Sequence, residues 1–271
     1  MITASIVTYH NSEFDVERVL KSAVESSIDK IYIIDNSKTD LFSSYEKQST
    51  KIKYIHNFNN GYGAGNNVAI KEAIASDNSI YHIVLNPDIY FENETIDDLV
   101  NYMNLNEDVG LVMPKVFYPS GELQYLCKLL PTPIDILFRW FLPASCFKNR
   151  DNRFKLLFTN YEQLMNVPYL SGCFMFFRIR ALDDVGLFDE RYFMHFEDLD
   201  ISRRIHEKYR TMYYPSASIV HAHAASHRTS LKMLKIGISS AIKYFNKWGW
   251  LFDKKRDIAN KRLLDEVEYK K

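Results

Sequence analysis

Three groups of polar residues, far apart in the chain, carry side chains suited to chemistry at a phosphate. Asn86-Pro87-Asp88 directly follows Tyr81–Leu85, a short apolar run typical of a buried strand. A carboxylate at the carboxyl end of a central parallel strand lies where open α/β sheets bind their ligands. Glu197-Asp198 and His221 add further carboxylates and an imidazole. Together these groups suit a metal-assisted attack on a nucleotide diphosphate.

Asp88 and His221 are the expected metal ligands. Mg²⁺ and Mn²⁺ prefer carboxylate oxygens and bridge them to phosphates, which favours Asp88 and either ion as cofactor. His221 ends an apolar run, so it is better placed at a strand end than His223 or His227. The alternatives stay open here, because Asn-Pro-Asp is also ordinary turn chemistry and a single histidine is more often structural.

Asp198 is the expected general base, with Glu197 holding the site. Both follow an aromatic-rich segment, residues 188–196, and a partly desolvated carboxylate is a better base than a solvated one. The alternative is that acids at a helix start only complement the helix dipole.

The elements that must position these residues alternate between strand and helix patterns over the first hundred residues. This predicts βαβ units and a mostly parallel sheet. Strands are expected at 2–9, 31–34, 52–56 and 81–86, and helices after Ser12 and through 69–74. The carboxyl ends of these strands would bring four loops together: Thr8-Tyr9-His10, Asp35-Asn36-Ser37, Asn59 to Asn67, and Asn86-Pro87-Asp88.

Two of these loops suit a nucleotide-sugar. The Asp35 carboxylate can only accept hydrogen bonds, so it suits the N3–H of uracil or thymine; the alternative is that it opens a turn. The stretch from Asn60 and Gly61 to Asn67 would let the backbone approach a ligand, with a helix N-terminus behind it for phosphate or sugar oxygens. Its alternative is a flexible turn.

Beyond Pro114 the pattern loosens. Residues 127–165 are aromatic and basic and contain three prolines, 169–177 is strand-like, and 201–209 fits a helix. These changes predict a domain at 1–228, with a nucleotide-sugar half at 1–114 and an acceptor half at 115–228, followed by an amphipathic helical tail at 229–271.

The tail predicts an interaction with a membrane surface. A helical stripe with a basic surround is typical of helices that lie on anionic lipid. The alternative is that the stripe packs on the protein's own core or on a second subunit, as in a homodimer. The stripe consists of Leu231, Leu234, Ile238, Ala241, Phe245, Trp248 and Phe252.

The composition narrows the class of protein. The chain has 271 residues, 46 % of them hydrophobic, enough for a large core, and its formal net charge of zero gives no reason to expect nucleic acid as a partner. Three widely spaced cysteines suit a reducing cytoplasm. The N-terminus reads as a strand rather than a secretory leader, and no apolar run approaches the ~20 residues of a membrane span. We therefore expect a cytoplasmic protein, peripheral on the inner face of the membrane.

Taken in order, the motifs closely resemble those of inverting glycosyltransferases of family 2, nearest to the bacterial rhamnosyltransferases that build O-antigen and other cell-surface polysaccharides. The resemblance runs from about residue 2 to 228. It rests on Ser5-Ile6-Val7-Thr8-Tyr9, Ile34-Asp35-Asn36-Ser37, Asn59-Asn60-Gly61-Tyr62-Gly63-Ala64-Gly65-Asn66-Asn67, Leu85-Asn86-Pro87-Asp88, Ser171-Gly172-Cys173-Phe174-Met175, Gly186-Leu187-Phe188-Asp189-Glu190, Glu197-Asp198-Leu199-Asp200 and His221.

The resemblance implies a GT-A fold, an α/β architecture with a Rossmann-like, mostly parallel sheet flanked by helices. In it, Asp198 falls on the catalytic base and His221 on a histidine that completes the metal site. Asn86 and Asp88 fall on the family's Asp-x-Asp position, and Asn86 departs from the general motif by removing one anionic ligand. The residues implied to line the nucleotide site are Thr8, Tyr9, Asp35 and Asn67.

The implied reaction is a single displacement that moves L-rhamnose from dTDP-β-L-rhamnose onto a glycan acceptor, expected to be lipid-linked. One alternative is a family 2 transferase that uses a UDP-hexose, because thymine and uracil share a hydrogen-bonding edge. A second is a non-catalytic nucleotide-sugar or glycan-binding protein, against which Asp88 and Asp198 together speak. A sugar-nucleotide pyrophosphorylase would need a basic Gly-rich loop after the first strand, and residues 9–12 supply none.

Overall fold

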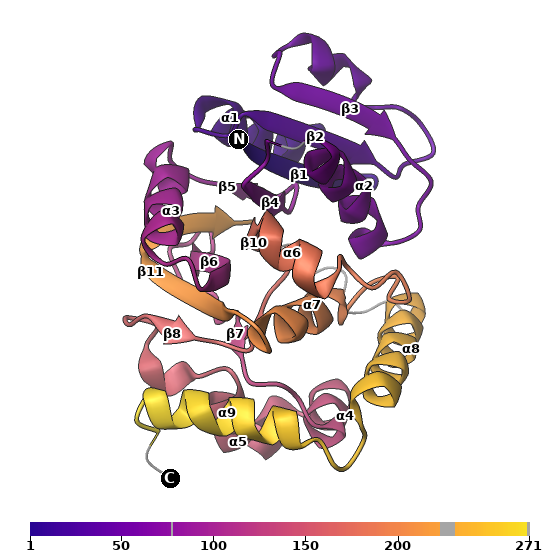
Figure 1. Ribbon diagram of the computed structural model, residues 1–271. Helices are drawn as coiled ribbons and strands as arrows, with labels where there is room; N and C mark the ends of the chain where they lie inside the picture. Colours follow the sequence, from indigo (N-terminus) through magenta and orange to yellow (C-terminus); the bar gives the residue numbers. More distant parts are fainter. Residues whose placement is uncertain (77, 223–230, 270–271) are drawn as a thin grey trace.

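A mixed sheet runs through the computed structural model, which describes residues 1–76, 78–222 and 231–269 (Figure 1). Within these residues the strand order is β3-β2-β1-β4-β10-β6-β11-β5, with β8 paired to β11 and a separate β7–β9 pair. The strands are β1 (Ile2–Thr8), β2 (Lys30–Asp35), β3 (Ile52–His56), β4 (Tyr81–Leu85), β5 (Ile89–Tyr90), β6 (Val109–Phe117), β7 (Cys127–Lys128), β8 (Met165–Asn166), β9 (Tyr169–Leu170), β10 (Phe174–Arg178) and β11 (Arg210–His221).

The first four strands confirm the expected parallel sheet. Strand β1 lies between β2 and β4, and β3 pairs with β2, all in parallel, so their carboxyl ends share one edge. Strand β4 is buried along its whole length, as its continuous apolar run predicts. Strand β10 then runs antiparallel between β4 and β6.

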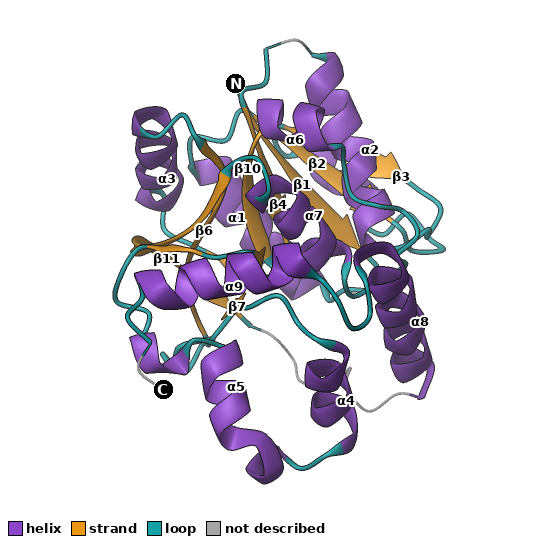
Figure 2. Cartoon of the chain, turned by 60° about the horizontal axis from the view of Figure 1, so that its bottom comes forward, coloured by secondary structure: helices purple, strands orange, loops and turns teal. Residues whose placement is uncertain are grey.

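Helices lie on both sides of this sheet, and Figure 2 shows α6 and α7 in front of the strands and α1 behind them. Helix α1 begins as expected, because Ser12 Oγ accepts a hydrogen bond from the Asp15 amide at 3.2 Å. The helices are α1 (Glu13–Glu25), α2 (Tyr62–Ala75), α3 (Glu94–Leu105), α4 (Pro133–Phe141), α5 (Lys148–Phe154), α6 (Ile179–Val185), α7 (Glu197–His206), α8 (Leu231–Trp248) and α9 (Lys254–Glu266), with short 3₁₀ turns η1 (Ser43–Lys47), η2 (Ala144–Phe147) and η3 (Leu157–Thr159).

The loop in the glycine-rich stretch, residues 60–67, is shorter than the sequence predicts. Helix α2 already begins at Tyr62, so Gly63 and Gly65 lie in its first turns. A Cβ on Gly63 would lie 3.0 Å from the Phe188 Cβ, and one on Gly65 would lie 2.9 Å from a Val7 methyl carbon. These two glycines therefore serve close packing of α2 against its neighbours rather than contact with a ligand.

Two further boundaries differ from the expectation. The strand-like run 169–177 is split into β9 and β10, and residues 171–173 leave the sheet between them. Helix α7 begins at Glu197 rather than at residue 201, which places Glu197 and Asp198 in its first turn.

The expected domain boundaries do not coincide with the packing. Pro114 lies inside β6, so the two halves share a strand. The tail also joins the protein's core: Ala241 and Phe245 of α8 are buried in a cluster with residues before and within α7, and Leu263 of α9 belongs to the main core. The centre of the predicted membrane stripe therefore packs on the protein itself, which was the alternative left open. Among the described residues, no helix is long and apolar enough to cross a membrane.

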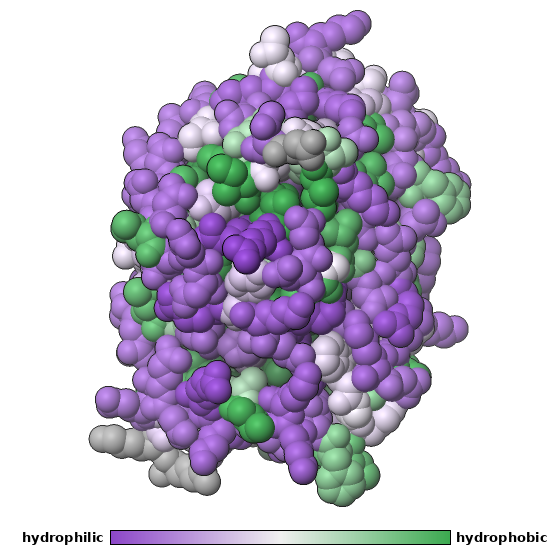
Figure 3. Space-filling model, viewed as in Figure 1, coloured by the Kyte–Doolittle hydropathy of each residue, from purple (hydrophilic) through white to green (hydrophobic). Residues whose placement is uncertain are grey.

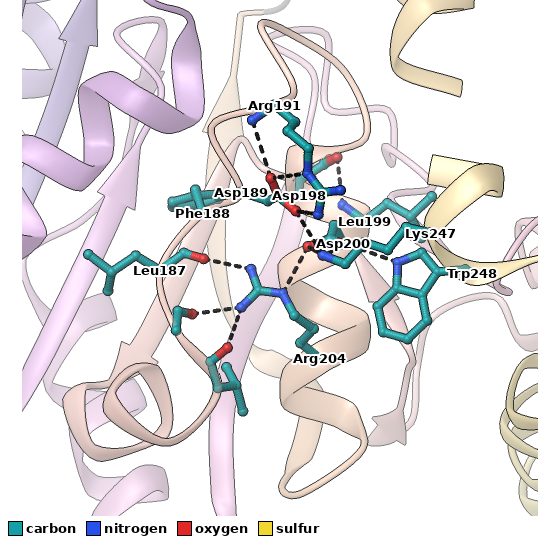
Figure 4. A network of polar contacts seen from close by, with 12 residues as sticks. Leu187, Phe188, Asp189, Arg191, Asp198, Leu199, Asp200, Arg204, Lys247 and Trp248 are labelled. Atoms are coloured by element: carbon teal, nitrogen blue, oxygen red, sulfur yellow. Dashed lines mark hydrogen bonds and ion pairs between the residues drawn. The ribbon is translucent and has the colours of Figure 1, made fainter. Parts of the chain in front are cut away.

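A buried polar network fastens α7 to α8 and to the loop before α7 (Figure 4). The fully buried Asp200 carboxylate accepts hydrogen bonds from Arg204 Nε, Lys247 Nζ and Trp248 Nε1, at 2.8 to 2.9 Å. Arg204 also donates to three carbonyls of residues 185–187. Because the partners come from α7 itself, from the end of α8 and from residues 185–187, the network fixes the position of the start of α7.

A second buried ion pair leads to a stability prediction. Arg203 of α7 is 2 % exposed, and its Nη2 lies 2.7 Å from Asp253 Oδ1, which also caps α9. Asp253→Ala would leave the buried guanidinium without its carboxylate, so we expect a loss of about 3–5 kcal/mol in the free energy of unfolding. Urea unfolding of wild type and variant measures it.

The matched control is Glu72→Ala. The side chains of Glu72 and its partner Lys53 are 45 % and 40 % exposed, so loss of this ion pair should cost no more than about 1 kcal/mol. Equal losses in the two variants would show that the Arg203–Asp253 pair does not fasten the tail.

Candidate active site

The expected metal ligands lie together at the carboxyl end of β4. Asp88 Oδ1 is 3.3 Å from His221 Nε2, and Nδ2 of the Asn86 side chain is 3.4 Å from the same ring atom. His221 is 5 % exposed and ends β11, whose neighbour β5 directly follows Asp88. The expected convergence of Asn86, Asp88 and His221 is therefore confirmed. His223 and His227 lie outside the described residues.

Gln124 holds the His221 ring from behind. Its Oε1 lies 3.0 Å from His221 Nδ1, and its Nε2 donates to the His221 carbonyl at 2.7 Å. With Nδ1 protonated toward this oxygen, Nε2 presents its lone pair toward Asp88. A second partner that fixes the tautomer is typical of metal-binding histidines.

These residues fit a divalent cation that is bound mainly through phosphates. They supply one carboxylate and one imidazole, and within the described part of the chain no group of three or more His, Cys, Asp or Glu could hold a metal ion. Mg²⁺ keeps several waters and often uses only one or two protein carboxylates together with substrate phosphates. Asn86 turns its side-chain nitrogen toward His221 while its Oδ1 accepts a hydrogen bond from Tyr62, so it adds no charge to the site.

Asp198 lies in the first turn of α7 with its carboxylate held by backbone amides. Oδ2 accepts a hydrogen bond from the Gly172 amide at 2.9 Å, and Oδ1 accepts one from the Leu199 amide at 2.8 Å. A Cβ on Gly172 would lie 3.0 Å from the Asp198 Cβ, so this approach depends on glycine. Asp198 is partly exposed, which leaves the carboxylate accessible to an acceptor.

Glu197 differs from its neighbour in burial. It is 5 % exposed, and its Oε2 has no hydrogen-bond partner among the described residues. Burial, together with the smaller effect of the adjacent Asp198 charge, raises the pKa of Glu197 to about 8. Glu197 is therefore protonated at neutral pH, which fits a residue that shapes the site and not the base itself.

The backbone of residues 171–173 connects the expected metal ligands to Asp198, the expected base. The backbone amide of Asn86 donates to the Cys173 carbonyl at 2.9 Å, and the backbone amide of Gly172 donates to the Asp198 carboxylate. Tyr62 completes the bridge from α2, with its hydroxyl 2.8 Å from Asn86 Oδ1 and 2.9 Å from the Gly172 carbonyl. Sequence reasoning gave Tyr62 no role of its own, although it lies in the Gly-rich motif.

Lys128 and Tyr169 are further residues that sequence reasoning missed. They face each other in the β7–β9 pair, with Lys128 Nζ 4.7 Å from the Tyr169 ring centroid. Burial lowers the pKa of Lys128, and the Asp198 charge opposes this shift. Burial raises the pKa of Tyr169, with Asp198 and Glu197 adding to it. No motif marks either residue, because they reach Asp198 only through this pairing.

The expected nucleotide edge lies at the ends of β1 and β2. Asp35 is fully buried, with Oδ1 accepting from Thr8 Oγ1 at 3.1 Å and from the Ser37 amide at 3.0 Å. The Tyr54 hydroxyl donates to Oδ2 at 3.0 Å. Asp35 therefore does open the turn that follows β2, and its contact with a pyrimidine ring of the nucleotide stays a prediction.

The other residues of this edge differ in accessibility. Tyr9 is 50 % exposed, and its ring is free to meet a planar ligand. Asn60 is exposed, whereas Asn36 is buried and accepts a hydrogen bond from Asn57. Gly61 has φ +109°, and a Cβ there would lie 2.2 Å from the Phe193 carbonyl oxygen. Gly61 thus makes a close approach to protein backbone, and its contact with a ligand stays a prediction.

Asn67 is engaged by protein groups, and its expected contact with a nucleotide stays a prediction. Its Oδ1 accepts from the Phe188 amide at 3.0 Å, and its Nδ2 donates to the Phe188 carbonyl and to Glu190 Oε1, both at 2.9 Å. The side chain is buried and satisfied by these contacts. Through these contacts Asn67 fixes the loop that leads toward α7.

A comparison with known families decides the assignment. The sequence pattern described as "Glycosyl transferase family 2" matches residues 5–186, which is more than half of the chain. The chain belongs to this family. The assignment fits the geometry, because the match covers the nucleotide edge, Asn86, Asp88 and the segment 171–173.

Curated relatives agree at low identity. The chain is 24 % identical to the rhamnosyltransferase WbbL of Escherichia coli (strain K12) over 274 residues, 97 % of this chain and 95 % of the relative. It is 29 % identical over 149 residues to N-acetylglucosaminyl-diphospho-decaprenol L-rhamnosyltransferase of Mycobacterium tuberculosis (strain CDC 1551 / Oshkosh), 53 % of this chain and 47 % of that relative. The chain is therefore a family 2 glycosyltransferase that is similar to proteins named as rhamnosyltransferases.

Solved structures confirm the fold. A structure of S. aureus TarS 1-349 in complex with UDP-GlcNAc superposes with a TM-score of 0.61 at 16 % identity, covering 97 % of this chain and 71 % of that one. GalNAc-T7 with UDP, GalNAc and Mn²⁺ gives a TM-score of 0.63 at 14 % identity, covering 99 % and 56 %. The protein thus has the GT-A fold, with a helical C-terminal part packed on it.

The raised pKa of Glu197 predicts how stability depends on pH. The folded protein holds a proton that the unfolded chain loses near pH 4.5. The contribution of Glu197 to stability is therefore full below this pH and is lost as pH rises to about 8, at up to about 1.4 kcal/mol per pH unit. Glu197→Gln mimics the protonated form and should flatten this decline.

Urea unfolding of wild type and Glu197→Gln across this pH range checks it. Glu122→Gln, a change at an exposed position, serves as the control and should leave the wild-type slope unchanged. Parallel pH profiles for wild type and Glu197→Gln would mean that the Glu197 carboxyl is ionised in the folded protein.

Proposed function

We propose that the protein is an inverting glycosyltransferase that moves L-rhamnose from dTDP-β-L-rhamnose to a lipid-linked glycan acceptor. The observation that carries the proposal is the joining of two functional groups by one backbone segment. Asp198 is held by the Gly172 amide, and the strand end that bears Asn86 and Asp88 is held by the Cys173 carbonyl. This linkage supports a reaction in which Asp198 acts as the base and the leaving diphosphate binds near Asp88.

The reaction we infer is a single displacement. Asp198 accepts the proton of an acceptor hydroxyl, whose oxygen forms a bond to the anomeric carbon. The bond between that carbon and the diphosphate breaks on the opposite face, and the nucleoside diphosphate leaves with the electron pair. A divalent ion held by Asp88 and His221 would neutralise the charge of this leaving group.

Neighbouring side chains support this chemistry. The ammonium of Lys128 lies in the buried surroundings of Asp198 and suits an anionic oxygen of the donor or acceptor. Protonated Glu197 adds no second negative charge beside the base. The exposed ring of Tyr9 and the buried Asp35 lie at the edge where the pyrimidine base is expected.

The donor and acceptor are inferred from relatives whose names state them. Two relatives are named as rhamnosyltransferases, and one of these acts on a diphospho-decaprenol lipid by its name. A UDP-hexose donor is the second candidate, because a structural neighbour binds UDP-GlcNAc. A lipid-linked acceptor would place the protein in the cytoplasm, at the inner face of the membrane.

Asp198→Asn tests the assignment of the base. The amide keeps the shape but accepts no proton, and a positioned base contributes roughly 10²–10⁴-fold to the rate. We expect transfer to fall by this factor while donor binding stays nearly intact. The assay is release of nucleoside diphosphate from a panel of dTDP- and UDP-sugars, with the donor affinity measured by calorimetry.

Asp183→Asn, a change in α6, is the control and should keep wild-type turnover. Wild-type rates in Asp198→Asn would remove Asp198 from the mechanism. If wild type releases nucleotide only from UDP-hexoses, the rhamnose donor is wrong while the transferase assignment stands. Donor binding without turnover for every sugar and acceptor would favour a non-catalytic binding protein.

Asp88→Ala and His221→Ala test the metal site. Both side chains are expected to contact one ion, so each change should weaken binding of the nucleoside diphosphate in the presence of Mn²⁺ or Mg²⁺. The double variant should lose less than the sum of the two effects. Calorimetric titration with and without the metal measures this, and full activity after exhaustive chelation with EDTA would contradict a metal requirement.

A further inference from the structure

Helix α4 presents an apolar stripe to solvent. Ile134, Leu137 and Phe141 recur at spacings of three and four along one side of the helix, and they are 49 %, 52 % and 59 % exposed. Leu142, which follows the helix, is 43 % exposed. A helix at the surface of a globular protein usually turns its apolar stripe inward, so this arrangement needs an apolar partner.

The charged side of α4 is turned toward the protein instead. Asp135 accepts a hydrogen bond from Arg150 of α5 at 2.5 Å, and Arg139 lies 2.7 Å from Asp151 of the same helix. The side chains of Asp135, Arg139 and Asp151 are only 9–19 % exposed. Because these pairs fasten the polar side to α5, the outward direction of the apolar stripe is fixed by the fold.

A third side of α4 connects this helix to α8 and to the active site. Trp140 packs against Gly237 of α8, where a Cβ would lie 3.3 Å from the indole ring. Trp140 also joins the cluster of Tyr169 and Phe196, the residue before Glu197. The two helices lie side by side at one edge of the molecule in both ribbon views (Figures 1 and 2).

The outer side of α8 adds an open groove with basic walls. The groove has a volume of about 360 Å³ and is lined by Lys235, Ile238, Ser239, Ile242 and Lys243. Its apolar floor, with a lysine at either end, suits a lipid headgroup above the start of its acyl chains.

The charges around these two helices favour an anionic partner. Helix α8 carries no acidic residue and four lysines, of which Lys247 is paired with Asp189 and Asp200, and residues 133–155 carry five basic and two acidic residues. The whole chain has a formal net charge of zero, so this edge is distinctly basic. Figure 3, in the same view as Figure 1, shows a mostly hydrophilic face with apolar side chains gathered in the upper middle and at a few other places.

We propose that the apolar stripe of α4 and the groove of α8, together the α4–α8 surface, dock on an anionic lipid bilayer. Apolar side chains would enter the headgroup region, and the lysines would face the lipid phosphates. The inference rests on the proposed lipid-linked acceptor for its purpose. Trp140 of α4 belongs to one cluster with Tyr169 and with Leu199, the residue after Asp198, so α4 packs on elements of the active site.

Liposome flotation tests this surface. Wild-type protein should float with vesicles of phosphatidylcholine mixed with phosphatidylglycerol, and poorly with phosphatidylcholine alone. Leu137→Ser/Phe141→Ser should lose most of the recovery. Lys232→Gln/Lys235→Gln should lose the preference for the anionic lipid, by roughly fivefold in partition for each lysine. Leu105→Ser, at an 85 % exposed leucine of α3, is the matched control and should float like wild type.

Two further measurements separate this inference from the proposed function. Nucleotide release with a water-soluble acceptor, without vesicles, should be equal in wild type and all three variants. Turnover in wild type with no flotation, or with equal flotation of wild type and Leu137→Ser/Phe141→Ser, would overturn the docking surface alone. A dimer by light scattering that this double variant dissociates would assign the stripe to a second copy instead and also overturn it.

Discussion

The backbone of residues 171–173 is the constraint on which the site depends. It leaves the sheet between β9 and β10, accepts a hydrogen bond from Asn86 through Cys173, and donates one to Asp198 through Gly172. Both contacts are made by backbone atoms of this segment, the Gly172 amide and the Cys173 carbonyl. A shift of residues 171–173 would therefore disturb both contacts. A Cβ on Gly172 would press on the Asp198 Cβ at 3.0 Å, which makes this glycine the point where the two halves of the site meet.

The base side needs a second fixed point, which is the start of α7. His195 and Phe196 adopt the left-handed conformation with φ of 66° and 71°, at a typical cost of about 1–3 kcal/mol each. The Asp200 network offsets this cost by tying the first turn to α8 and to the loop before α7. The C-terminal helices are therefore part of the catalytic structure and not an appendage to it.

The sequence predicted the parallel strands and the meeting of Asn86, Asp88 and His221 because these depend on local pattern and on the shared edge of a parallel sheet. It missed contacts with partners that are remote in the chain. The side chain of Asn67 is occupied by residues 188–190, and Lys128 reaches the base only through the β7–β9 pairing. Neither contact leaves a periodic signal in the chain.

In the amphipathic tail, too, the sequence pattern does not identify the partner of a helix. Its stripe was read correctly as one side of a helix as far as Trp248, where α8 ends, whereas Phe252 lies beyond the helix. Periodicity does not say what covers that side, and the structure covers Ala241 and Phe245 with protein. Helix α4 lies in a proline-broken stretch that gave no clear pattern, and it is the helix whose apolar side remains exposed. Which stripe faces solvent is decided by tertiary packing.

The central claim is that Asp198 acts as a base opposite a diphosphate leaving group held near Asp88 and His221. In-line displacement in this arrangement inverts the anomeric centre. The most direct measurement is therefore the anomeric configuration of the product by NMR, after transfer from a β-linked donor to a soluble acceptor. The account predicts an α-linked product throughout, and a β-linked product would contradict it.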